Sequence, residues 1–217
     1  MRNPQYYFIN CFDSKEISVD KLAAFATDHI GRLTAQNGSG EWTARIAATT
    51  AAMTAFDDAI SDDLIKGAFR ASRKDAKDGF RETLPAEVGK ILNFVRAHFG
   101  EGSPEVIACA PDGLKGFRDA PDDKVENHLT KLIAGVTDVQ ATVGAAVVTQ
   151  ATDLKAAWMT IYLASEDSTS DKAMTEAEQR TAKLALQDEL FTTLLALASK
   201  HRNQPEMLGL YMQPHLA

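Results

Sequence analysis

Apolar residues recur every three or four positions along most of the chain, which is the spacing of one face of an α-helix. The clearest series lies in the second half and steps alternately by four and three positions, with one further step of four at its end. It comprises Val125, Leu129, Leu132, Val136, Val139, Val143, Ala146, Gln150 and Leu154. This series predicts a heptad seam on a helix from Pro121 to about residue 164, buried against another helix of this chain or of a partner. A break between residues 135 and 138 is the alternative, because Gly135 weakens the helix there.

Seven prolines mark where other helices are expected to begin or end. Residues 5–84 and 122–204 contain none of them, and a proline inside a helix costs ~3 kcal/mol. We therefore expect long helices in both stretches. Pro85 should lie in the first turn of a new helix, and the polar residues 165–170 should form a turn. The fold class is all-α, an elongated multi-helix bundle of about six or seven helices.

Residues 6–12 form the one β-like run, Tyr-Tyr-Phe-Ile-Asn-Cys-Phe. A single strand is not stable alone, so we expect a short extended N-terminal arm. Both sides of this arm are largely apolar, which predicts that it is covered on two sides. The cover is either a groove between helices of the same chain or a dimer interface.

A weak internal repeat relates the two halves of the chain. Leucine or valine residues at positions 84, 88, 92 and 95 match leucines 102 residues later. The repeat predicts two related helical halves, at residues 17–112 and 121–217, which follow the arm at 1–16 and are joined by a connector at 113–120. One single domain is the alternative.

The composition is that of a folded protein, with 45% hydrophobic and 24% charged residues. A net charge of −7 argues against nucleic acid and anionic membranes as partners, because both are polyanions. No run approaches the about 20 apolar residues of a membrane span. We expect a cytoplasmic location, with Cys11 and Cys109 as reduced, buried thiols.

Motifs of enzyme chemistry are missing from the sequence. None of the five histidines follows an acidic residue by three positions, as the ligands of di-iron helical bundles do. There is no C-x-x-C pair, no Walker loop, no G-x-G-x-x-G and no G-x-S-x-G. We therefore predict no catalytic residue, no metal site and no cofactor.

Two residue sets are candidates for binding. The first is a basic stripe at helical spacing, for an anion or an acidic partner: Lys66, Arg70, Arg73, Lys77 and Arg81. Its alternative is a solvated face that pairs with nearby acidic residues. The second is an apolar and aromatic set for a pocket between helices: Trp42, Met53, Phe56, Trp158 and Tyr162. Its alternative is ordinary core packing.

The heptad seam and the apolar arm both favour association. We therefore expect a non-enzymatic interaction or structural protein that acts through helix surfaces, with a protein partner or a second copy in a homodimer. The alternative is a helical bundle that binds a small ligand or catalyses a reaction in a pocket between its helices.

Overall fold

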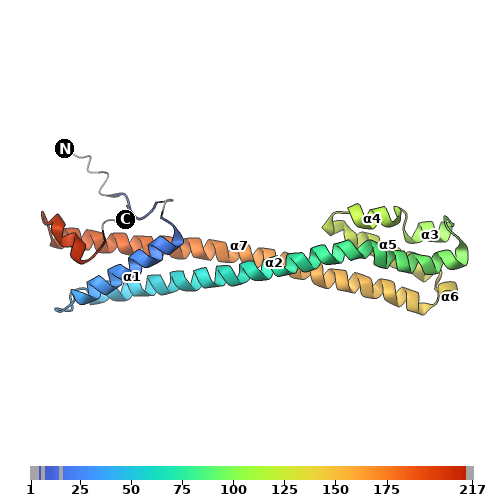
Figure 1. Cartoon of the computed structure of the whole chain (residues 1–217), viewed down its shortest axis with the longest axis horizontal. Coiled ribbons are helices and arrows are strands. Elements are labelled where there is room, and N and C mark those ends of the chain that lie inside the picture. Colours follow the sequence, from blue (N-terminus) through green and yellow to red (C-terminus); the bar gives the residue numbers. More distant parts are fainter. Residues whose placement is uncertain (1–4, 6–7, 15–16, 214–217) are drawn as a thin grey trace. The chain divides into compact units, whose positions relative to one another are not determined.

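A computed structural model describes residues 5, 8–14 and 17–213, and this part of the chain is all-α (Figure 1). The elements in chain order are α1 (Val19–Ala35), α2 (Thr43–Phe99), α3 (Pro104–Cys109), α4 (Gly113–Asp119), α5 (Asp122–Asp138), α6 (Gln140–Val143), α7 (Ala145–Lys200) and the 3-10 helix η2 (Pro205–Leu210). None of the described residues lies in a strand. The predicted all-α class with an N-terminal arm is confirmed. No helix in the described ranges is both long and apolar enough to cross a membrane.

Local sequence explains where several helices begin and end. Ser18 caps α1, where its side chain accepts a hydrogen bond from the Lys21 amide, and Ser103 caps α3 in the same way. Gly100 follows the end of α2 with a φ of 87°, a left-handed conformation that glycine adopts without strain. The residues at these helix ends thus set the ends themselves.

Three helix boundaries differ from the prediction. Pro85 lies inside α2 and does not start a helix; the buried Leu84, Val88 and Leu92 hold this stretch against its neighbours, which offsets the lost backbone hydrogen bond. Residues 165–170 are helical within α7, and residues 113–119 of the expected connector form α4. Within 165–170, the hydroxyl of Ser168 donates to the Ser165 carbonyl, so this buried polar side chain is satisfied by its own helix.

The predicted helix from Pro121 to residue 164 is interrupted. It ends at Asp138, and a short α6 separates it from α7. Gly144 has a φ of 90° at the C-terminus of α6, a backbone conformation that a helix cannot continue. Leu132 is fully buried, as the seam predicts, and Val139 packs at the edge of the same core.

The chain forms two compact units. Unit 1 combines the described residues up to Lys66 with those from Lys172 onwards, and unit 2 comprises residues 67–171. Each long helix therefore contributes its first part to one unit and its last part to the other. This division differs from the predicted halves 17–112 and 121–217, because partners in a core are chosen by spatial packing and not by nearness in sequence.

Three helices of the first half of the chain nevertheless have counterparts of similar length, in the same order, in the second half. Helices α1 and α5 have 17 residues each, α2 and α7 have 57 and 56, and α3 and η2 have 6 each. Each later helix begins 101 to 103 residues after its counterpart. The buried face of α1 and that of α5 share one spacing: Leu22, Ala26, His29 and Leu33 in the first, Val125, Leu129, Leu132 and Val136 in the second. A common origin by duplication stays a prediction that this correspondence supports.

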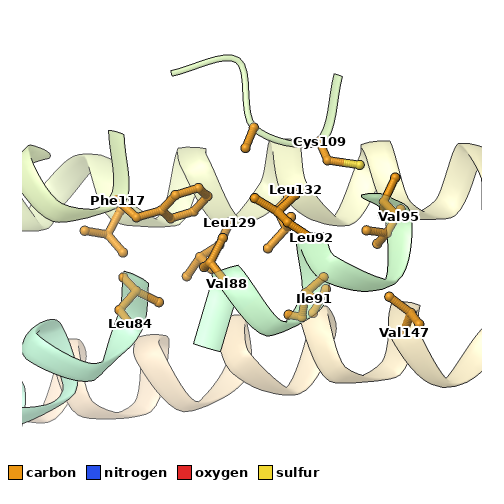
Figure 2. Packing of buried hydrophobic residues seen from close by; sticks show 14 of the residues in the cluster. Leu84, Val88, Ile91, Leu92, Val95, Cys109, Phe117, Leu129, Leu132 and Val147 are labelled. Carbon is orange, nitrogen blue, oxygen red and sulfur yellow. The ribbon is translucent and has the colours of Figure 1, made fainter. Parts of the chain in front are cut away.

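The core of unit 2 lies where α5 packs against segments of α2 and α7. Figure 2 shows Leu84, Val88 and Leu92 of α2 among Leu129 and Leu132 of α5, and all five are buried. Helix α3 covers one end of this core. Its Cys109 lies against the backbone of α5 at Gly135. A Cβ atom at Gly135 would lie 2.6 Å from the Cα of Cys109, so this approach of two helices requires glycine.

We predict that Gly135→Ala lowers the free energy of unfolding by about 1–3 kcal/mol, because the added methyl group forces α3 and α5 apart. Urea unfolding followed by circular dichroism measures this. The matched control is Gly31→Ala in α1, where no heavy atom lies within 4 Å of the new Cβ; it should raise stability by about 0.5–1 kcal/mol. Equal effects at the two glycines would contradict the close approach.

Candidate functional site

The predicted basic stripe is largely bound to groups of its own unit. In unit 2, the Lys77 Nζ lies 2.8 Å from Asp122 Oδ2 and 4.0 Å from Glu166 Oε1. The hydrogen bond to Asp122 is the main cause that raises the pKa of Lys77. Lys77 is therefore a cation with two acidic partners, which leaves little of its charge for an external anion.

Arg81 joins α2 to the C-terminal end of α4. Its guanidinium donates to the carbonyls of Phe117, Arg118 and Ala120, and its side chain is 16% exposed. Carbonyls at the end of a helix have no partner within that helix, so Arg81 satisfies them. In unit 1 the residue 102 positions later, Lys183, donates to the Ile17 carbonyl just before α1. Both basic residues thus fasten the chain that leads into a 17-residue helix.

The other three members of the stripe are dispersed. Arg73 donates to the Ala164 carbonyl and stacks over Phe69, Arg70 is exposed, and Lys66 belongs to unit 1. The structure therefore does not gather all five residues into one site. In unit 2, the roles of Lys77 and Arg81 depend on Asp122 and α4. The spacing of the stripe did not reveal these partners.

The predicted apolar pocket set is divided between the units. Trp42, Met53 and Phe56 lie in the core of unit 1, whereas Trp158 and Tyr162 stack on each other in unit 2. Trp42, Phe56 and Trp158 are buried among other apolar side chains. These residues pack as core within each unit, which is the alternative that the sequence left open.

The N-terminal arm lies over α7 in unit 1. Phe12 is buried against Phe25, its carbonyl accepts a hydrogen bond from Gln187, and Asn10 donates to Asp188 at 3.0 Å. Phe8 and Ile9 are 86% and 60% exposed. The intramolecular groove thus holds Phe12 but leaves Phe8 and Ile9 uncovered. Tyr6 and Tyr7 lie outside the described residues.

Unit 1 contains a buried histidine that was not a candidate site residue. His29 is fully buried, and its Nδ1 lies 2.7 Å from the Tyr211 carbonyl, which requires a proton on Nδ1. Burial lowers the pKa of His29 and outweighs the opposing effects of this hydrogen bond and of Asp28. His29 shares the helical spacing of Leu22, Ala26 and Leu33, which places it on the buried face of α1.

Two of the surface hollows in the described residues, one from each unit, are considered as candidates for binding. The first, of about 440 Å³, lies between the end of α7 and η2 in unit 1; Leu197, Leu208 and Tyr211 are among its walls, and His201 contributes a ring. The second, of about 560 Å³, is a groove between α2 and α7 in unit 2 with Ile91 and Leu154 in its lining. Across the described residues, no cluster of three or more histidine, cysteine or acidic side chains could hold a metal ion.

Comparison with known proteins identifies no relative of this chain: no family model, no curated protein and no solved structure matches it.

We predict that Arg81→Met lowers the free energy of unfolding by about 1.5–3 kcal/mol, because charged hydrogen bonds to α4 are lost and their carbonyls stay without a donor. Chemical unfolding at neutral pH measures this. Arg70→Met is the matched control on the same helix; it is exposed and should change stability by less than about 0.5 kcal/mol. A loss of similar size in the control would contradict this role of Arg81.

We also predict that His29 makes unit 1 less stable in acid. Its folded pKa is lowered, so its contribution is complete above the unfolded pKa of about 6.5 and is lost as pH falls from there through the folded pKa. Unfolding free energies at pH 8 and pH 5 should differ less in His29→Gln than in the wild type. The exposed His98→Gln should keep the wild-type difference; identical behaviour of the two variants would contradict the prediction.

Proposed function

We propose that this chain is a non-enzymatic helical interaction protein that pairs with a second copy of itself through the groove of unit 2. One observation carries the proposal: Phe94 is 47% exposed at a groove with Ile91 and Leu154 in its lining. Exposed aromatic side chains beside apolar hollows are the usual anchors of protein interfaces.

The spacing of the lining residues supports a helix-binding surface. Glu87, Lys90, Ile91 and Phe94 form one wall and recur along one face of α2, whereas Leu154 belongs to the wall from α7. The surface thus carries an aromatic side chain and an apolar hollow close together. A two-fold axis would place Phe94 of each copy at the hollow of the other, since such an axis uses the same patch twice.

The charged residues at the groove permit one ion pair between two copies. Lys90 lies on the α2 wall and Asp153 on the α7 wall, so a two-fold arrangement can bring Lys90 of one copy near Asp153 of the other. Within one chain, Lys90 pairs with Glu87 at 2.6 Å, and Asp153 forms no ion pair with any described residue. Pairing between copies therefore supplies an opposite charge for Asp153.

We predict that the wild type is a dimer and that Phe94→Glu weakens dimerisation at least tenfold, because it removes the anchor and buries a charge. A tenfold change corresponds to about 1.4 kcal/mol, well within the effect of an anchor residue. Sedimentation equilibrium measures the dissociation constant. Asn93→Glu adds the same charge at the neighbouring exposed position and should leave the dimer intact.

A charge exchange separates self-association from other effects. Lys90→Asp and Asp153→Lys should each weaken the dimer, and the double variant should recover much of the affinity because the pair is restored with reversed signs. A monomeric wild type, or equal dimerisation of the Phe94 and Asn93 variants, would refute the proposal.

A further inference from the structure

We propose that residues 203–213, which follow α7 in unit 1, form a strap that His29 fastens to α1 at neutral pH and that opens in acid while the core of unit 1 stays folded. The strap contains η2 and the buried Tyr211 and Met212. It belongs to unit 1 alone, so the proposal stands independently of the dimer proposed for the groove of unit 2.

Three polar contacts join the strap to α1, and all three come from neighbouring turns of that helix. They link His29 to Tyr211 at 2.7 Å, Arg32 to Gly209 at 3.0 Å and Asp28 to Gln213 at 3.0 Å. Among the described residues, the backbone–backbone hydrogen bonds of the strap run only within residues 201–212. Side chains of α1 therefore hold the strap in place, without any shared backbone ladder.

Unit 2 shows that packing alone does not require histidine at this place. Polar residues of unit 1 and their counterparts 102 or 103 positions away in unit 2 are His29 and Leu132, Arg32 and Gly135, and His201 and Phe99. Leu132 is fully buried, as His29 is. A leucine thus fills the same place in a helix of equal length, and histidine adds the hydrogen bond to the strap, which leucine cannot make.

The buried ring of His29 accommodates one proton only. Nδ1 carries this proton, because it donates to the Tyr211 carbonyl, and Nε2 is buried with no hydrogen-bond partner among the described residues. A second proton would bind at Nε2 and create a charged donor without an acceptor. Burial of such a group is costly, so the protonated ring favours a conformation in which water reaches Nε2.

Charged groups on α1 do not remove this cost. Asp28 raises the pKa of His29, but it forms an ion pair with Arg32 at 2.6 Å. Burial has the largest effect and lowers the pKa of His29 in spite of Asp28 and of the hydrogen bond to Tyr211. The fastened strap therefore holds the neutral form of the ring.

Other titratable groups lie around Tyr211. The His201 ring packs against it at 5.5 Å, and the Trp42 ring at 5.8 Å. Lys200 lies over the Trp42 ring and is paired with Glu41. None of these described groups accepts a hydrogen bond from the buried Nε2 on α1, so the acceptor for a second proton has to be water.

The strap is the part of unit 1 that can leave this ring at the least cost. Helix α1 buries four apolar side chains besides the histidine: Leu22, Phe25, Ala26 and Leu33. By contrast, η2 buries none of its residues, and the buried side chains of the strap are Tyr211 and Met212. Separation of the strap thus exposes less apolar surface than separation of α1. Asn203, with a φ of 62°, turns the chain at the start of the strap.

The pH range follows from the lowered pKa of His29. The strap is fully fastened above the ordinary pKa of about 6.5, and it opens progressively as the pH falls from there. In the open form the ring is hydrated and titrates at its ordinary pKa. Protonation can therefore raise the ratio of open to closed strap by at most about thirtyfold between pH 7.5 and pH 5.0.

The test is hydrogen exchange of the intact chain at pH 7.5 and pH 5.0, followed by mass spectrometry and corrected for the intrinsic pH dependence of exchange. Protection of the strap should fall about five- to thirtyfold at pH 5.0, whereas α1 and residues 186–197 of α7 should change less than about twofold. An equal loss in all three segments would mean that the whole unit unfolds, and an unchanged strap would mean that it does not open. Either result would overturn the proposal.

Neutral replacements assign the response to His29. His29→Gln keeps a donor for the Tyr211 carbonyl but does not titrate, so protection of its strap should change less than about twofold between the two pH values. His29→Leu reproduces Leu132 of α5 and serves if the first variant does not fold. His201→Gln is the matched control, because it removes the other histidine beside Tyr211 and should keep the wild-type response. A full response in the His29 variants, or its loss in His201→Gln, would refute the role of His29.

Discussion

Burial of one apolar face of a 17-residue helix against two long helices is the contact on which each unit depends. In unit 2 the face of α5 with Leu129 and Leu132 packs with residues of α2 and α7 in one core. In unit 1 the face of α1 with Leu22 and Leu33 is buried, and its buried residues have the same spacing along the helix as those of α5. Two long helices alone would leave this apolar area in water, and each buried leucine gains ~1.5–3 kcal/mol. The short helix therefore makes each unit a stable core.

Polar contacts then fasten the chain around these cores. Arg81 binds the end of α4, and Lys183 binds the segment before α1, at corresponding places in the two units. A basic side chain at these positions satisfies backbone carbonyls that no helix can satisfy. This role explains why basic residues at helical spacing need not form a surface for an external anion.

The units also differ where the short helix after each long helix meets the core. Gly135 lets α3 settle on α5, whereas Arg32 bonds to η2 and His201 replaces an apolar ring. Unit 2 has an exposed groove around Phe94, and unit 1 has a hollow between the end of α7 and η2. Corresponding helices thus carry different surface hollows in the two units.

Local sequence determined the helical class, the caps at Ser18 and Ser103 and the burial of Leu132, because these depend on residues within one or two helical turns. It did not determine whether Pro85 would end a helix, since that depends on how much apolar packing holds α2 through the proline. Only the tertiary structure decided which helix segments share a core, and thereby separated Trp42 from Trp158 and paired Lys77 with Asp122. It also decided both candidate sites, because a hollow is formed by residues whose meeting is set by packing between helices and not by their spacing along the chain.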